Sequence, residues 1–188
     1  MVLGILVSMV DGRNAVYMSA PITSGARFLR WRGQHEGDVD PWGHEFKSDF
    51  QREVVEPNRA RARSVARGLR ESFREVLIDP TAVDDIDGWT QDDYRHLWAR
   101  IIEEYVRAVI CTDGWQYSNG SSYEFLVAQR CAIATLKENR ETLTLEEGMQ
   151  LIQSAIDEMR APGLSTVFLE NVLDELGKLR AEKGVCAK

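Results

Sequence analysis

The sequence predicts an α/β fold: a doubly wound, mostly parallel sheet of four or five strands, Rossmann-like or flavodoxin-like, with helices on both faces. Short apolar runs alternate along the chain with segments whose apolar residues recur at helical spacing, which is the pattern of repeated strand–helix–strand units. Two of these runs, 15–20 and 107–112, pass directly into loops rich in small and hydroxyl-bearing residues. In open sheets of this class, the loops at the carboxyl ends of strands bind ligands.

The first half of the sheet region contains a strand, a long connection, a helix and a second strand. The strands are expected at 15–20 and 76–78, the second ending before Asp79. Between them, residues 58–75 carry apolar side chains at every fourth position and predict a helix. The segment 26–56 is long for a structureless loop, so we expect an insertion that is functional or partly helical.

The second half of the sheet region begins with a helix at Thr90 and Asp93, which have the spacing of a capping box. The remaining elements are expected in this order: a helix to 105, a strand at 107–112, a helix from 123 to about 131, and a strand at 132–136. The apolar residues 2–10 are too few to span a bilayer and lack the features of a signal peptide. We expect them to form an extra strand or a packing segment.

The character of the chain changes beyond residue 144. Apolar residues at helical spacing over 145–159 and again over 166–180 predict two helices, with the break between them at Ala161-Pro-Gly163. We therefore divide the chain into an α/β domain, 1–144, and a helical C-terminal appendage, 145–188. Such a hairpin would cover one face of the sheet or form a dimer interface.

Composition narrows the class of protein. The chain is 44% hydrophobic and 28% charged, with a formal net charge of −7. An acidic chain is poorly suited to polyanionic backbones, so no nucleic-acid polymer is expected as a partner. The three cysteines have no metal-ligand spacing, which fits free thiols in the cytoplasm. We expect no membrane association, no metal and no other cofactor.

The segment 113–124 joins a predicted strand to a predicted helix and carries the strongest functional signal. Gly120 and Ser121 allow the backbone to approach a ligand closely and to donate hydrogen bonds to it. Glu124 follows just inside the helix, where a carboxylate facing a pocket predicts chemistry at an electrophilic carbon. The structural alternative is a first-turn glutamate that complements the helix dipole.

A second segment, 15–25, has the same organisation: an apolar strand containing Tyr17 that runs into a Pro/Thr/Ser/Gly loop. Together the two segments resemble the nucleoside 2-deoxyribosyltransferase-like superfamily, which includes nucleotide N-glycoside hydrolases. The resemblance covers roughly residues 14–135. It rests on the following residues: Tyr17 through Pro21, then Gly114, Trp115, Ser118, Gly120 and Glu124.

The resemblance implies roles for individual residues. Glu124 would be the nucleophile that attacks the anomeric carbon of a nucleoside or nucleotide, and Tyr17 would hydrogen-bond the glutamate and fix its rotamer. For Tyr17, an aromatic core residue is an equal alternative. The family also has an acidic residue near the loop glycine or on the preceding helix, whereas Asn119 precedes Gly120 here. That leaves Asp93 and Asp79 as candidates for the acid that protonates the leaving base, although Asp93 is also explained as a cap.

The substrate is expected to be a small nucleoside or nucleotide, held by the two loops. The expected binding residues are Ser19, Pro21, Thr23, Ser24, Gly25, Trp115, Ser118, Asn119, Gly120 and Ser121. The sequence thus predicts cleavage or transfer at an N-glycosidic bond, in a homodimer or higher homo-oligomer as the resemblance implies. Two alternatives stay open: a noncatalytic nucleotide-binding protein on the same scaffold, and an NAD glycohydrolase.

Overall fold

The computed structural model describes residues 12–35, 37, 39–83 and 86–186. At its centre lies a four-stranded sheet in the order β2-β1-β3-β4, and all three strand pairs are parallel. The strands are β1 (Ala15–Ser19), β2 (Leu77–Ile78), β3 (Val106–Cys111) and β4 (Ala134–Lys137). The predicted parallel α/β sheet is therefore confirmed. The apolar residues 2–10, expected as a strand or packing segment, lie outside the described residues.

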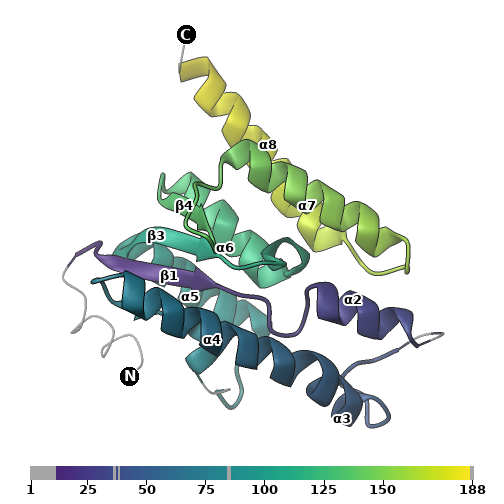
Figure 1. Ribbon diagram of the computed structural model, residues 1–188. Coiled ribbons are helices and arrows are strands. Elements are labelled where there is room, and N and C mark those ends of the chain that lie inside the picture. Colours follow the sequence, from purple (N-terminus) through teal and green to yellow (C-terminus); the bar gives the residue numbers. More distant parts are fainter. Residues whose placement is uncertain (1–11, 36, 38, 84–85, 187–188) are drawn as a thin grey trace.

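Helices cover both faces of this sheet (Figure 1). Alternate residues of a strand point to opposite faces, and β1 divides its side chains accordingly. Val16 and Met18 pack with Ala62 and Ala66 of α4 (Glu56–Ser72) on one face. Tyr17 belongs to the larger core on the other face, which is formed with α5 (Gln91–Tyr105) and α6 (Asn119–Arg130). The sheet is doubly wound, as the alternating pattern predicts.

The C-terminal hairpin consists of α7 (Leu145–Arg160) and α8 (Val167–Cys186), which run side by side above α6 (Figure 1). Its buried residues, such as Ile152 and Leu169, belong to the same apolar cluster as Phe125 of α6. Gly148 of α7 allows close contact at this junction, because a Cβ atom there would lie 2.2 Å from Cζ of Phe125. None of the helices in the described part of the chain is long and apolar enough to cross a membrane.

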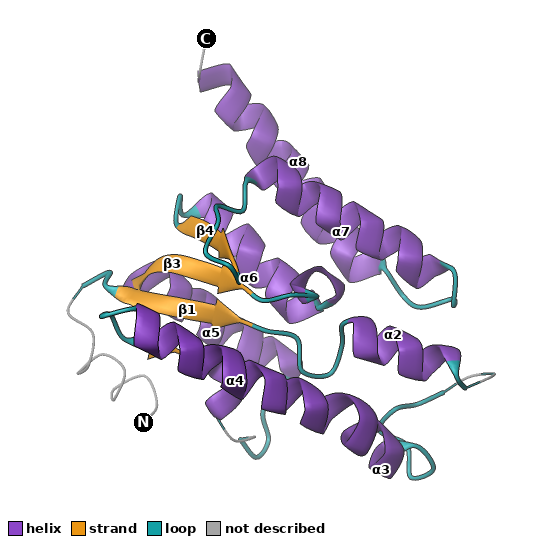
Figure 2. Cartoon of the chain, viewed as in Figure 1, coloured by secondary structure: helices purple, strands orange, loops and turns teal. Residues whose placement is uncertain are grey.

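The segment 26–56 is largely helical (Figure 2). It contains α2 (Ala26–Gly33), α3 (Lys47–Phe50) and a π-helical turn, η1 (Gln51–Val55), that continues into α4. Trp31, Phe50, Val54 and Val55 are buried together as a separate apolar cluster. The described part of the segment therefore has its own small core, and the expectation of partial helicity is confirmed.

Two boundaries differ from the prediction for local reasons. Helix α6 begins at Asn119 rather than at 123, because Ser118 is its N-cap and its Oγ accepts a hydrogen bond from the backbone N–H of Ser121 at 3.3 Å. After α6, Ala132 adopts a left-handed conformation, with φ 53°. This turn delays β4, which begins at Ala134 rather than at 132. Two short 3₁₀ turns, η2 (Pro80–Ala82) and η3 (Trp115–Tyr117), follow β2 and β3.

Candidate active site

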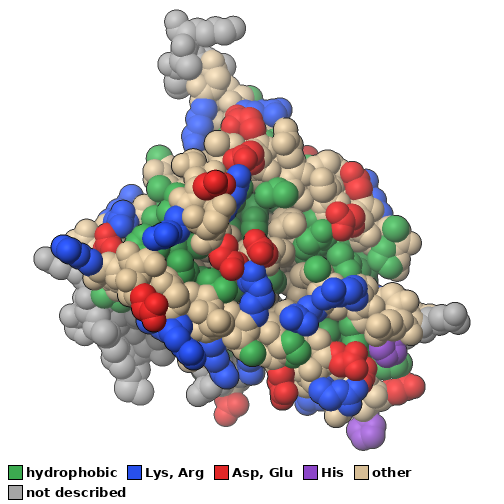
Figure 3. Space-filling view, in the orientation of Figure 1, with side chains coloured by type: hydrophobic (Ala, Val, Ile, Leu, Met, Phe, Trp, Pro, Cys, Tyr) green, Lys and Arg blue, Asp and Glu red, His purple; other side chains and the backbone are tan. Residues whose placement is uncertain are grey.

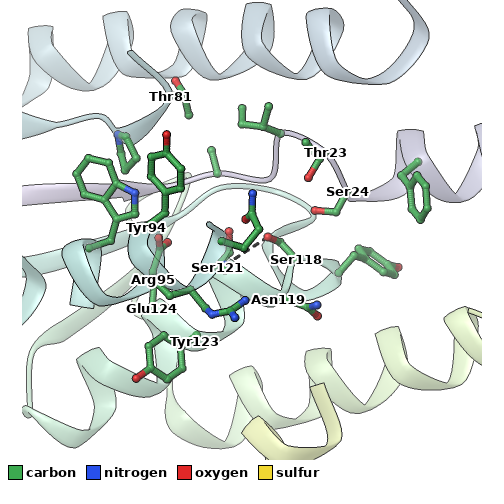
Figure 4. Close-up of a pocket in the computed structure, with 18 of the residues that line it drawn as sticks. Thr23, Ser24, Thr81, Tyr94, Arg95, Ser118, Asn119, Ser121, Tyr123 and Glu124 are labelled. Atoms are coloured by element: carbon green, nitrogen blue, oxygen red, sulfur yellow. Dashed lines mark hydrogen bonds between the residues drawn. The ribbon is translucent and has the colours of Figure 1, made fainter. Parts of the chain in front are cut away.

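A cavity of about 590 Å³ opens beyond the carboxyl ends of the strands. Its size is that of a small-molecule site. It is bounded by the loop after β1, by α5, by the beginning of α6, and by the connection between α7 and α8 (Figure 4). Of the expected binding residues, six line it: Thr23, Ser24, Ser118, Asn119, Gly120 and Ser121.

Glu124 reaches the wall of this cavity and is held from behind by two side chains of β1. The hydroxyl of Tyr17 donates to Oε1 of Glu124 at 2.6 Å, and the hydroxyl of Ser19 donates to Oε2 at 2.5 Å. Tyr17 and Ser19 are both fully buried and do not line the cavity themselves. Ser19, expected as a substrate-binding residue, thus contacts the carboxylate.

The sheet topology produces this contact between residues more than a hundred positions apart. Strand β1 pairs in parallel with β3, so that Tyr17 lies beside Val109 and Ser19 beside Cys111. The chain then leaves β3, turns through η3 and enters α6, whose second turn carries Glu124 back over the end of β1. Because i and i+2 share a face of a strand, Tyr17 and Ser19 both point at the glutamate.

The surroundings of Glu124 raise its pKa to about 7, and the principal cause is burial of the carboxylate. The hydrogen bonds from Ser19 and Tyr17 act in the opposite direction, because they stabilise the ionised form. The pKa of Tyr17 is raised well above its ordinary value by burial and by the neighbouring Glu124 charge. Tyr17 therefore remains a neutral donor at any pH at which Glu124 ionises.

Three of the expected binding residues, Pro21, Gly25 and Trp115, pack within the protein and do not line the cavity. Gly25 and Gly114 have positive φ angles of 88° and 84°, a conformation that favours glycine. They lie against each other, since a Cβ at Gly114 would be 3.9 Å from Cα of Gly25, and Pro21 packs on both. Trp115 is 3% exposed and packs on Phe125 with ring centroids 4.8 Å apart. Its indole is a core group.

The two carboxylates considered as the acid are hydrogen-bonded to neighbouring threonines. Asp93 is exposed, accepts hydrogen bonds from the backbone and hydroxyl of Thr90 at 2.8 and 2.6 Å, and completes the capping box of α5. These hydrogen bonds lower its pKa. Asp79 is buried and accepts from the backbone and hydroxyl of Thr81 at 3.0 and 2.6 Å, with Arg70 at 3.7 Å. Neither aspartate is among the described residues that line the cavity.

The structure adds lining residues outside the expected binding set. Tyr94, Arg95 and Trp98 line the cavity from α5, and Phe28 and Trp42 line it from the segment 26–56. Tyr94 and Trp98 lie on the apolar face of a predicted helix, where aromatic residues are expected to pack in the core. The one available signal was the length of the 26–56 segment, since long insertions in compact domains are commonly functional.

The arrangement provides one half-buried carboxylate, several hydroxyls and the N-terminus of α6, which can hold an anionic group. Within the described residues, no group of three or more His, Cys, Asp or Glu side chains could hold a metal ion. On the face drawn in Figure 3, acidic and basic side chains are interspersed. Comparisons with protein-family models, with curated proteins and with solved structures gave no significant match. The function must therefore be argued from the site.

Proposed function

We propose that the protein cleaves or transfers an N-glycosidic bond of a nucleoside or nucleoside monophosphate, with Glu124 as the nucleophile. The observation that carries the proposal is the contact of Tyr17 and Ser19 with the two oxygens of Glu124, at 2.6 and 2.5 Å. A nucleophilic carboxylate must be held rigidly and partly removed from water. A glutamate that only complements a helix dipole needs neither donor.

The chemistry would proceed in two displacements. An oxygen of the ionised Glu124 attacks the anomeric carbon, the carbon–nitrogen bond breaks, and its electron pair leaves with the base. Water or a second base then attacks the same carbon and releases the carboxylate. A neutral base needs a proton as it leaves. Tyr94 lines the cavity, and its hydroxyl accepts a hydrogen bond from the backbone of Ile86 at 2.6 Å, so its own proton can pass to the leaving base. The water or second base that attacks next returns a proton to the Tyr94 oxygen.

The test is release of free base from a panel of ribonucleosides, deoxyribonucleosides, their 5′-monophosphates and NAD, followed by chromatography. We expect release from one class, and loss of that release in Glu124→Ala with binding retained. Leu151→Ala is a suitable control, since Leu151 is 36% exposed and lies outside the lining residues. If none of the panel yields base, the glycosidase proposal is wrong.

A second candidate is a noncatalytic nucleotide-binding protein. The observation that favours it is that Asp93 and Asp79, the expected acids, are both hydrogen-bonded to threonines and do not line the cavity themselves. Thermal stabilisation by a nucleotide, without base release from any of the panel, would support this candidate.

We also propose a cytoplasmic homo-oligomer, as the resemblance and the free cysteines imply. Light scattering on the purified protein measures the oligomeric state. A monomer at micromolar concentration would contradict the oligomer.

A further inference from the structure

Two pairs of aromatic side chains line the cavity from different parts of the molecule. The first pair, Tyr94 and Trp98, lies one turn apart on α5. Trp98 contacts Tyr17 with ring centroids 6.1 Å apart, and Tyr17 is hydrogen-bonded to Glu124. Trp98 therefore packs on the residue that holds the carboxylate, and both members of the pair pack in or against the main core.

The second pair, Phe28 and Trp42, comes from the segment 26–56 and belongs to a separate aromatic cluster. Phe28 is stacked on Trp31 with centroids 6.2 Å apart, and Trp42 packs edge-on against Phe50 at 5.1 Å. Trp42 nevertheless exposes 51% of its surface and lines the cavity. An exposed indole whose ring is held in place is a stacking platform for a planar group.

Positive charge also reaches the cavity, from Arg95 on α5 and Arg59 on α4. The guanidinium of Arg95 is paired with Asp92 and lies 4.9 Å above the ring centre of Phe168. These contacts fix its direction, and Figure 4 shows the side chain extending toward Asn119 at the start of α6. Arginines beside a helix N-terminus favour an anionic group.

We propose that the substrate is a dinucleotide, whose scissile N-glycoside lies at Glu124 and whose second base stacks on Trp42 and Phe28. The linking phosphates would lie near Arg95 and Arg59. The inference rests on the proposed N-glycosidase function and extends its substrate from one nucleoside monophosphate to a dinucleotide, in which two are joined. One cavity of about 590 Å³ is lined by the proposed nucleophile, by two arginines and by two separate aromatic pairs. A single nucleoside is too small to contact all of these groups at once.

The reaction balances for a dinucleotide such as NAD. Glu124 forms a bond to the anomeric carbon, the bond to the pyridinium nitrogen breaks, and nicotinamide leaves with the electron pair as a neutral molecule. Water then displaces Glu124, giving ADP-ribose and one proton. A purine base leaving from the other half would in addition need a proton from a donor such as Tyr94.

NAD and its two halves, nicotinamide mononucleotide and AMP, test the inference because the halves contain the same two glycosidic bonds. Release of nicotinamide and of adenine is followed for each compound. We expect kcat/KM for NAD to exceed that for either half by about tenfold or more, as a stacked second base provides. Trp42→Ala should remove most of this advantage by raising KM for NAD more than KM for either half. Trp42→Phe should restore it, and Leu151→Ala should have no effect.

The possible failures are distinguishable. Equal kcat/KM for NAD and for a half in the wild-type protein overturns the dinucleotide inference and leaves the glycosidase proposal standing. An equal loss on NAD and on the halves in Trp42→Ala overturns the assignment of the second base to Trp42. No release of base from any nucleoside, nucleotide or dinucleotide overturns both proposals.

Discussion

The cavity has one wall formed by α6 where it packs on the sheet, called here the sheet wall, and a second wall formed by the segment 26–56. The two walls differ in the groups that they present. The sheet wall presents Glu124, backed by the buried hydroxyls of Tyr17 and Ser19. The other wall presents the rings of Phe28 and Trp42, supported by a separate aromatic cluster. We infer that the sheet wall carries out the chemistry and the second wall binds the substrate. Changes to the sheet wall should therefore alter kcat, whereas changes to the second wall should alter KM.

The largest expected effect is that of Glu124→Gln. Removing a nucleophile while keeping its shape should lower kcat by at least about 10³-fold, with KM changed by less than about threefold. Steady-state kinetics of base release measure both constants. A drop confined to KM would mean that Glu124 binds substrate rather than reacts, and would remove the difference between the two walls.

Glu124→Gln should also change how the free energy of unfolding depends on pH. The pKa of Glu124 is about 7 in the folded protein, against 4.5 for an ordinary glutamate. Between these values the folded state binds more protons than the unfolded state, so the free energy of unfolding falls as pH rises, by roughly 3 kcal/mol in total. Glu124→Gln should lack this component and gain stability relative to wild type at pH 8. Urea unfolding at pH 5 and pH 8 provides the comparison, and an unchanged difference between the two pH values would contradict the raised pKa.

The activity of the wild-type protein should also depend strongly on pH. The nucleophile must be ionised and its pKa is about 7, so kcat/KM should rise about tenfold per pH unit below this value and level off above it. A rate profile from pH 5 to pH 9 gives the midpoint. A midpoint near that of an ordinary glutamate would show that the hydrogen bonds of Tyr17 and Ser19 fully offset burial.

Tyr17→Phe should have an intermediate effect. It removes a hydrogen bond of 2.6 Å to the carboxylate, which should lower kcat by about tenfold to a hundredfold and raise the kinetic pKa by about one unit. Ser19→Ala is the matched comparison, since Ser19 donates to the other oxygen. If neither variant moves the kinetic pKa, the two residues serve only as core.

Gly148→Ala should lower the free energy of unfolding and leave the residues of both walls in place. Its Cβ would lie 2.2 Å from Phe125, on the helix that carries Glu124. The required shift should cost about 1–3 kcal/mol, measured by thermal or urea unfolding. Gly177→Ala in α8 is a control, because nothing lies within 4 Å of a Cβ at that position.

The smallest expected effect is that of Asp93→Ala. Its carboxylate completes the capping box of α5 with Thr90, so the variant should lower Tm by a few degrees and leave kcat unchanged. A large loss of kcat with normal stability would instead identify Asp93 as the acid.

Sequence reasoning predicted the sheet wall better than the second wall, and the reason is physical. Strands and strand-end loops leave local patterns that placed Glu124 and Tyr17 at the ends of two strands, and the family resemblance implied their hydrogen bond. The roles of Ser19, Pro21 and Trp115 depend on which loop lies against which. Phe28 and Trp42 could not be assigned to the cavity from the sequence, because exposed and buried aromatic residues look alike there.

The most direct test of the central claim is the stereochemistry of the product. With a substrate identified by base release, the reaction is run in the presence of methanol, and the anomeric configuration of the methyl glycoside is read by NMR. Double displacement at Glu124 predicts the β-anomer from a β-nucleoside, with retention of configuration. The α-anomer would mean a single displacement, with Glu124 as a base that activates water, and would contradict a nucleophilic role.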